Sequence, residues 1–348
     1  MKGRYDTFNI NAATKLVPIK FILNLKSFDF VLLNALCKIL LYLMAPVVSL
    51  CMSYNFTLKK YDIVHVNMTI CSYYLPFLKF WSVLFGGKVK YVETFHTNWN
   101  LLKIYNKLIN IISWSTADAV VWEIGLNEGS VIRKKSLQKN IYYIPFGIDS
   151  EVKPNIAKQE FFKNTWKLDR SKINIMTMSR LKIFEKKIDI MLEVVAKLIE
   201  YGYSDYQLFL VGDGSDRFKI EEIAKNLKIR DNVTITGYMD DPISIISLCD
   251  IYFVAMAYED TGVSGLQAGF VNSACIGFQA IPDYQAKDSY FFSGNNSESI
   301  AKKIIKLRDN SYLEKYRCKF NNHVKTERTL LGFARKYQIV FNNVKKQN

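Results

Sequence analysis

The sequence predicts an α/β protein of two domains, each built around a parallel sheet. Apolar runs of strand length alternate with stretches of helical period, which is typical of parallel α/β layers, and the series occurs twice along the chain. The 348 residues also exceed what one ordinary core holds. Polar residues follow the predicted strands, so we expect functional groups at the carboxyl edge of each sheet, where open α/β sheets bind ligands.

In the first half, four apolar runs are predicted to be strands: 61–66, 89–94, 119–123 and 141–144. The first two lead to polar tips at His65–Asn67 and His96–Asn98. After a turn at Pro145–Asp149, residues 150–172 are mixed, polar and poorly periodic, so we place the interdomain boundary there. The predicted domains are 1–155, 156–325 and a C-terminal helix over 326–348.

In the second half, a strand over Ile173–Met178 precedes a helix with one apolar face between Ile188 and Ile199. Three further strands are predicted, at 207–211, 233–236 and 251–255. Near the C-terminus, Phe333–Val344 carries an apolar stripe of helical period, which requires a packing partner.

The most apolar stretch, Phe28–Met52, is long enough for a membrane span. We expect Pro46 to divide the run, and no cleavable signal pattern is recognised, so a buried or membrane-facing amphipathic helix is favoured over a span. Nearby lysines would attract an anionic leaflet. Peripheral contact with the inner face of the cytoplasmic membrane is therefore a hypothesis.

Composition narrows the classes of function. Lys and Arg number 47 against 32 Asp and Glu, a net charge of +15 that favours anionic partners such as phosphates, nucleic acid or acidic lipid. No nucleic-acid-binding signature is present and the lysines are spread along the chain, so nucleic acid is disfavoured. The six cysteines lie far apart without zinc-ligand spacing, so we expect a reduced compartment, no disulfide and no structural metal.

Three weak motifs follow strands of the second half. Arg180 and Lys186 put two cations at a strand end, where they could clamp a diphosphate, although such pairs are usually solvated surface. The glycines Gly212 and Gly214 allow a sharp turn that brings amides near an anion, with a plain turn as the alternative. Gly237-Tyr238-Met239 could let a flat base lie against the backbone, with an ordinary loop as the alternative.

A fourth motif is more specific. Glu259 precedes a loop of small residues and a helix start, which supply in order a hydroxyl-binding group, room for a phosphate and free amides at the positive end of a helix. The residues of this motif that we assign to a site are Glu259, Thr261, Gly262, Val263, Ser264 and Gln267.

These four motifs, in this order, resemble family 4 of the retaining GT-B glycosyltransferases, the group 1 type. The likeness runs from Tyr61 to the C-terminus and is strongest over Ile173–Leu307. It implies two Rossmann-like domains with parallel sheets facing across a cleft, and a last helix that crosses back to the first domain. It also implies metal-independent transfer of a sugar, with retention, from a nucleotide-sugar in the C-terminal domain to an acceptor in the N-terminal one.

The resemblance assigns roles residue by residue. Arg180 and Lys186 fall on the donor diphosphate, and Glu259 lies near the donor sugar. His96, in Val92-Glu93-Thr94-Phe95-His96, faces the transferred sugar, so His96 and Glu259 are the expected catalytic residues. His65 is assigned to packing. His323, to which the resemblance gives no role, lies in a charged C-terminal stretch that we expect to be a solvated helix. The remaining expected donor contacts are Gly212, Gly214, Tyr238, Met239, Thr261, Gly262, Val263, Ser264 and Gln267.

The chain also departs from the family pattern. Gln267 stands where a second Glu is expected, which predicts about tenfold weaker donor binding. One extra residue leaves Lys186 and Lys187 as alternatives, and Asp283 replaces a commoner Glu. Residues 5–11 already resemble a second strand, and no Gly-Gly element precedes them. Either the natural start lies upstream or this is a degraded copy.

The expected function is thus a glycosyltransferase acting on a saccharide or lipid-linked acceptor in bacterial surface polysaccharide biosynthesis, such as capsule or lipopolysaccharide, in the cytoplasm. The alternative is a catalytically weak or inactive subunit that acts as partner or regulator of another transferase. An epimerase of the same architecture is a further alternative, less favoured because the order of the donor motifs is that of the transferases.

Overall fold

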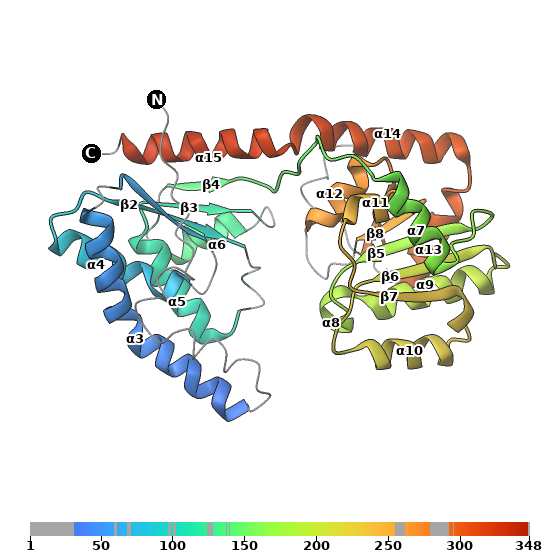
Figure 1. Cartoon of the computed structure of the whole chain (residues 1–348), viewed down its shortest axis with the longest axis horizontal. Coiled ribbons are helices and arrows are strands. Elements are labelled where there is room, and N and C mark those ends of the chain that lie inside the picture. The colour runs from blue at the N-terminus through green and yellow to red at the C-terminus, as the bar shows by residue number, and fades with distance from the viewer. Residues whose placement is uncertain are drawn as a thin grey trace. The chain divides into compact units, whose positions relative to one another are not determined.

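The chain forms two compact units in the computed structural model (Figure 1). The structure describes residues 31–58, 61–67, 71–96, 99, 102–123, 128–136, 138, 140–254, 262–278, 292–294 and 296–346. Unit 1 holds the described residues up to Trp122, those of Gly129–Tyr143 and those from Ile339 onward. Unit 2 holds Glu123, Glu128 and the described residues of Ile144–Gln338. The predicted strand near residues 5–11 lies outside the described residues.

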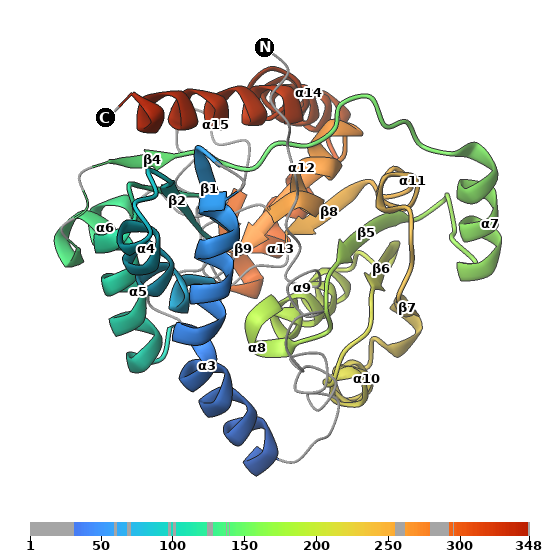
Figure 2. The same cartoon turned by 60° about the vertical axis from the view of Figure 1, so that its left-hand side comes forward.

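Unit 1 contains a parallel sheet whose described strands run in the order β1-β2-β3-β4. Consecutive neighbours joined by right-handed crossovers place their helices on one face of the sheet. In Figures 1 and 2, α4 and α5 lie on one side of this sheet and the end of α15 on the other. The elements are α3 (Val31–Leu58), β1 (Ile63–Asn67), η2 (Cys71–Tyr73), α4 (Leu75–Leu84), β2 (Lys90–Phe95), α5 (Ile104–Thr116), β3 (Ala119–Trp122), α6 (Glu128–Lys135) and β4 (Ile141–Tyr143).

The core of unit 1 is rich in aromatic side chains. Tyr91 and Phe95 of β2 and Trp114 of α5 are all almost fully buried. The rings of Phe95 and Trp114 meet edge to face with centroids 5.0 Å apart, a geometry that adds to the stabilisation from burial. Contacts between buried aromatic rings therefore hold α5 against the sheet.

Helix α3 is continuous through Pro46, so the prediction that this proline divides the apolar run is wrong. Partners on α4 hold the helix at this point. Trp81 Nε1 donates to the Pro46 carbonyl at 3.0 Å, and Ser53 Oγ donates to the Leu78 carbonyl at 2.9 Å. A proline inside a helix removes one backbone hydrogen bond, and packing on α4 offsets that loss. Within the described part of the chain, no helix has the length and hydropathy needed to cross a membrane.

Unit 2 contains a parallel sheet with the described strand order β10-β9-β8-β5-β6-β7. The strand predicted over Ile173–Met178 is β5 with the same bounds, and the helix predicted to follow it is α9. The elements are α7 (Ile156–Trp166), β5 (Ile173–Met178), α8 (Ile183–Lys186), α9 (Ile188–Glu200), β6 (Tyr206–Val211), α10 (Arg217–Asn226), η4 (Arg230–Asn232), β7 (Val233–Gly237), α11 (Pro242–Ile246), β8 (Ile251–Val254), α12 (Gly262–Phe270), β9 (Ala274–Phe278), β10 (Phe292–Gly294), α13 (Ser297–Lys306), α14 (Asn310–Glu327) and α15 (Leu330–Lys345).

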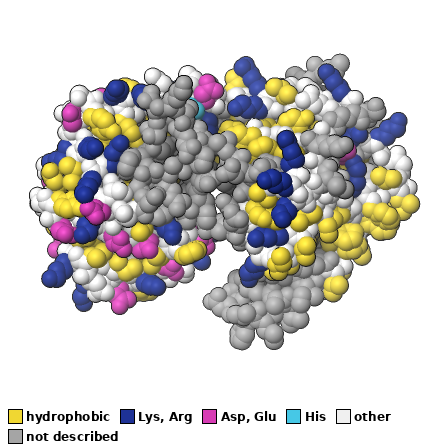
Figure 3. Space-filling model, turned by 180° about the vertical axis from the view of Figure 1, so that it is seen from behind, with side chains coloured by type: hydrophobic (Ala, Val, Ile, Leu, Met, Phe, Trp, Pro, Cys, Tyr) yellow, Lys and Arg dark blue, Asp and Glu magenta, His cyan; other side chains and the backbone are white. Residues whose placement is uncertain are grey.

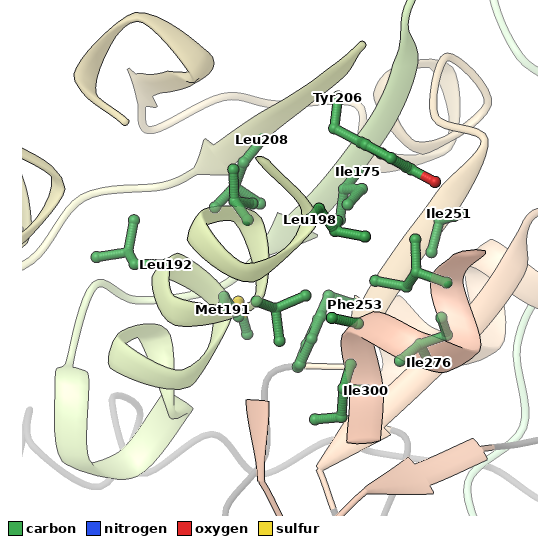
Figure 4. Close-up of a cluster of buried hydrophobic side chains, with 14 of the residues drawn as sticks. Ile175, Met191, Leu192, Leu198, Tyr206, Leu208, Ile251, Phe253, Ile276 and Ile300 are labelled. Atoms are coloured by element: carbon green, nitrogen blue, oxygen red, sulfur yellow. The ribbon is translucent and has the colours of Figure 1, made fainter. Parts of the chain in front are cut away.

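Two apolar clusters cover the two faces of this sheet. The first joins the sheet to α9, α10 and α13, and Figure 4 shows Ile175 and Leu208 of the strands close to Leu198 of α9. The second joins it to α7, α11, α12 and α14. Both faces of a parallel sheet are buried in this way, which explains why its strands read as continuous apolar runs.

The segment that we expected to be a poorly periodic boundary contains helix α7. Asn155 begins the helix by accepting a hydrogen bond from the Lys158 backbone N–H at 3.0 Å. Phe162 and Trp166, one turn apart, stack with centroids 5.1 Å apart and belong to the second cluster of unit 2. The two units divide between Tyr143 and Ile144.

The C-terminal helix α15 begins in unit 2 and ends in unit 1. Its start is fixed by Ile148, whose N–H donates to the Arg328 carbonyl at 2.8 Å and whose carbonyl accepts from Leu330 at 2.7 Å. From Ile339 onward the helix belongs to unit 1, where Val340 and Val344 are buried. The helix thus crosses back to the first domain, as the sequence predicts.

Candidate active site

The order of strands in unit 2 places a topological switch point beside β5. This strand pairs with β6 on one side and with β8 on the other. The segments that follow β5 and β8 therefore leave toward opposite faces of the sheet, and the crevice between them is the usual ligand site of an open α/β sheet. The predicted donor residues come from these two segments and from those after β6 and β7.

The segments after β5, β6 and β7 are tied together by backbone hydrogen bonds. Ser179 N–H donates to the Val211 carbonyl at 3.0 Å, and Leu181 N–H donates to the Asp213 carbonyl at 3.0 Å. The fit requires glycine at two positions. A Cβ on Gly212 would lie 2.0 Å from the Ser179 oxygen at a φ of +138°, and a Cβ on Gly214 would lie 2.4 Å from the Leu181 oxygen. Both glycines thus have a packing role, and their contact with a donor stays a prediction.

Arg180 and Lys186 lie together after β5. The Arg180 side chain is 78% exposed and lies 4.0 Å from the Glu185 carboxylate. Partial burial and the neighbouring Arg180 guanidinium lower the pKa of Lys186 from its ordinary value. The short helix α8, which ends at Lys186, is fixed by Asp216, whose carboxylate accepts from the Ile183 N–H at 2.9 Å. The two cations are therefore held near each other by the fold.

Gly262 and Ser264 of the predicted small-residue motif lie in the first turn of α12, not in a loop. Burial raises the pKa of Tyr252, and a hydrogen bond with Ser264 opposes that shift. The same tyrosine oxygen accepts from the Met178 N–H, the last residue of β5, at 3.1 Å. Through Tyr252, the first turn of α12 is joined to the end of β5, just before Arg180. The positive end of the helix and the two cations thus lie at one sheet edge.

The remaining donor predictions differ in exposure. Tyr238 is 83% exposed after Gly237, whose φ is +79° with open space on its Cβ side. Met239 instead packs against the second cluster of unit 2. On α12, Val263 is exposed, and Gly262 and Gln267 are partly buried. Their donor contacts stay predictions. Glu259 and Thr261, with Asp283, lie outside the described residues.

In unit 1, polar side chains gather at the ends of β1 and β2. His96 is hydrogen-bonded to Asn67, and His65 shares a hydrogen bond of 2.6 Å with the buried Thr94. The His65 ring also meets the Phe341 ring of α15 edge-on at 5.6 Å. His65 therefore has packing partners, and the role of His96 toward a sugar stays a prediction.

A buried carboxylate lies beside this group. Glu93 of β2 is 1% exposed and accepts hydrogen bonds from Ser72 after β1 and from Ser113 of α5, the latter at 2.7 Å. Burial raises its pKa to about 7, although both hydroxyls oppose the shift. Glu93 thus fixes the segment after β1 to the helix after β2.

Several features were not predicted. Tyr252 carries no motif, because its role depends on contacts between separate elements. Asp216 and Glu93 had sequence signals, a carboxylate before a helix and a carboxylate within an apolar strand. His323, expected to be solvated, is partly buried, and burial and the nearby Arg328 lower its pKa. Among the described residues, no group of three His, Cys, Asp or Glu side chains could hold a metal ion.

Comparison with known proteins places this arrangement in a class. Residues 158–326 match the family model of the glycosyl transferases group 1. Among solved structures, a glycosyltransferase from Rickettsia africae is 18% identical, with a TM-score of 0.72 over 87% of this chain and 83% of that one. Anabaena HepE in complex with UDP is 12% identical, with a TM-score of 0.73 over 85% of this chain and 82% of that one.

Two curated relatives are also transferases or synthases of sugar derivatives by name. The N-acetyl-alpha-D-glucosaminyl L-malate synthase of Bacillus anthracis is 25% identical over 72% of this chain and 66% of its own length. The alpha-D-kanosaminyltransferase of Streptomyces kanamyceticus is 35% identical over 23% of this chain and 21% of its own length. The alignments thus span less than two thirds of each relative. Residues 158–326, just under half of the chain, thus match the glycosyl transferases group 1, and the likeness to solved structures shows the GT-B fold.

Proposed function

We propose that the chain transfers a sugar, with retention and without a divalent metal, from a nucleoside-diphosphate sugar to a saccharide or lipid-linked saccharide acceptor. The observation that carries the proposal is the pair of cations after β5. Partial burial and the guanidinium of Arg180 lower the pKa of Lys186, so a bound anion would relieve an unfavourable arrangement. A diphosphate supplies that anion.

In this reaction, the bond between the anomeric carbon and the diphosphate oxygen breaks, and negative charge grows on the leaving diphosphate. Arg180, Lys186 and the amides at the start of α12 would stabilise that charge. Gln267, on the same helix, is proposed to bind the ribose, and Glu259 the donor sugar and its phosphate. The new bond forms from an acceptor hydroxyl oxygen on the same face of the sugar, and the hydroxyl proton passes to the leaving diphosphate, with His96 hydrogen-bonding the sugar.

The nucleotide is supported by a structural neighbour. HepE was solved with UDP and with UDP-glucose. We therefore propose a nucleoside diphosphate as the leaving group, held by unit 2. We also propose that the acceptor belongs to bacterial surface polysaccharide synthesis, such as capsule or lipopolysaccharide, at the cytoplasmic membrane face. Transfer of radiolabel from the nucleotide-sugar into a membrane lipid fraction supports this acceptor, and labelling of soluble saccharides alone contradicts it.

The mechanism is tested by the product. After a donor screen has found a substrate, NMR of the new glycosidic bond is expected to show the anomeric configuration of the donor, with the same rate in EDTA. An inverted product contradicts retention. A rate that EDTA abolishes and Mg²⁺ restores contradicts metal independence.

A second candidate is the catalytically weak or inactive partner subunit. It is favoured by Gln267, which replaces an expected carboxylate on α12. In that case nucleotide binds to unit 2 and no transfer occurs until the partner enzyme is added.

A further inference from the structure

Helix α4 of unit 1 turns an apolar face outward. Its inner face is buried against the core through Leu75 and Leu78. Side chains at three-, four- and seven-residue spacing lie on the same helix face. The outer positions are Phe77, Phe80, Val83 and Leu84, which are 37%, 59%, 65% and 65% exposed. A surface helix normally carries polar residues on that side.

Helix α5 repeats the pattern. Its inner face holds Ser113 and Trp114, which are fully buried. Its outer face carries Ile104, Leu108 and Ile112, which are 73%, 57% and 54% exposed. Helices α4 and α5 pack on each other, so their outer faces are neighbours.

Helix α3 extends the same surface. Its described outer residues Leu43, Val47 and Tyr54 are 69%, 50% and 53% exposed. The Tyr54 ring meets that of Phe85, at the end of α4, edge-on with centroids 5.7 Å apart. We call this surface the α3–α5 face, defined by Leu43, Val47, Tyr54, Phe77, Phe80, Val83, Leu84, Phe85, Ile104, Tyr105, Leu108 and Ile112.

The charges around the α3–α5 face are mostly positive. Residues 31–118 contain eight lysines, no arginine and three acidic residues, Asp62, Glu93 and Asp118. Asp118 pairs with Lys79 at 2.5 Å and lies 3.9 Å from Lys90, which leaves six other lysines in this range. Glu93 is buried, and Asp62 forms an ion pair with Lys345 at 2.6 Å. Figure 3 shows apolar and basic side chains on unit 1, at the right of that view, with acidic side chains sparse. Unit 2 in the same view carries many acidic side chains.

We propose that the α3–α5 face docks on an anionic lipid bilayer. Single exposed apolar residues are ordinary, whereas contiguous patches mark interaction surfaces. The lysines favour an anionic bilayer as the binding partner. Apolar side chains at the headgroup boundary and cations at lipid phosphates together give peripheral binding. Phe80 and Leu84 would enter the boundary region, with Lys88 and Lys103 at the phosphates. The inference stands independently of the proposed transfer chemistry.

The experiment is cosedimentation of the full chain with vesicles of phosphatidylcholine, alone or mixed with phosphatidylglycerol. The wild type is expected to bind the anionic vesicles and to be released by high salt. The double variant F80N/L84N is expected to bind at least about tenfold more weakly, since it removes two inserting side chains. The matched control F161N/L331N changes residues of the same types in unit 2 that are 61% exposed each, and is expected to bind as the wild type does.

The results of this experiment distinguish a bilayer from a second copy of the chain as the partner of the α3–α5 face. Absence of binding to anionic vesicles, or equal loss in both double variants, overturns the proposal. A wild-type dimer that F80N/L84N converts to a monomer identifies a second copy of the chain as the occupant and also overturns it. Nucleotide-induced thermal stabilisation, measured without vesicles, tests the proposed function separately, because neither double variant touches the donor residues.

Discussion

The carboxyl edges of the two sheets carry different chemistry. In unit 2, two cations and the start of α12 lie near the end of β5, an arrangement suited to an anion. In unit 1, the strand ends carry His65, His96, Asn67 and Thr94, which are hydrogen-bonding groups without an exposed charge pair. One edge therefore has cations that suit a diphosphate, and the other has hydrogen-bonding groups that suit hydroxyls, as the proposed function requires. This difference is the physical basis for assigning donor and acceptor to different units.

The largest expected effect follows from removing a cation in unit 2. Each of Arg180→Ala and Lys186→Ala is expected to lower the transfer rate by about 10²–10³-fold, because charge on the leaving diphosphate loses a preorganised partner. Steady-state kinetics checks this. Lys219→Ala, on α10, is the control and is expected to retain the rate. Equal rates in all three variants would place the donor elsewhere.

A buried carboxylate makes the stability of unit 1 depend on pH near neutrality. The pKa of Glu93 is raised from 4.5 to about 7 in the folded chain. Between these values the folded state binds more protons than the unfolded one, so the free energy of unfolding falls as pH rises and levels off above pH 7. The loss is about 3 kcal/mol on the usual conversion.

Glu93→Gln removes the titrating group and keeps the shape. Denaturant unfolding between pH 5 and pH 8 is expected to show a shallower fall for this variant than for the wild type. Glu298→Gln, at an exposed ion pair of unit 2, serves as control. Identical pH profiles for wild type and Glu93→Gln would mean that Glu93 is charged in the folded state.

A smaller effect tests the glycine fit in unit 2. Gly212→Ala adds a clash with Ser179 to a left-handed backbone, whereas Gly202→Ala meets open space at a φ of +88°. Gly212→Ala is therefore expected to cost about 1–3 kcal/mol more than Gly202→Ala in free energy of unfolding. Chemical denaturation measures both. Equal losses would show that the segments after β5 and β6 are not closely packed.

The smallest effect concerns donor affinity. Gln267→Glu restores a charged acceptor on α12, so nucleotide affinity is expected to rise about tenfold. Titration calorimetry with the nucleoside diphosphate checks it. Unchanged or weaker binding would place Gln267 away from the ribose.

Apolar runs and the polar residues that follow them were sufficient to predict part of the fold of unit 2. The bounds of β5 and the positions of Arg180 and Lys186 follow from an apolar run and the polar residues after it. Helix α7 was not predicted, because only Phe162 and Trp166 of its residues are buried and two positions give no period. The link from Ser264 through Tyr252 depends on three separate elements, and no local pattern encodes it.

Pro46 is another position where a local sequence signal did not predict the structure. Propensity alone ends a helix at a proline, whereas α3 continues because Trp81 and neighbouring residues of α4 hold it. Local signals therefore predicted which residues follow several of the strands, and tertiary contacts decided where propensity was overridden.

Unit 2 is proposed to bind a nucleoside diphosphate at the end of β5. Thermal unfolding of the purified chain with UDP, GDP, ADP, CDP and dTDP tests it most directly, with Arg180→Ala and Lys219→Ala alongside. A ligand at 100 times its Kd stabilises the folded state by about 2.7 kcal/mol. At least one nucleotide is expected to raise the Tm of the wild type and of Lys219→Ala but not of Arg180→Ala. A folded wild type that shifts with none of them would contradict it.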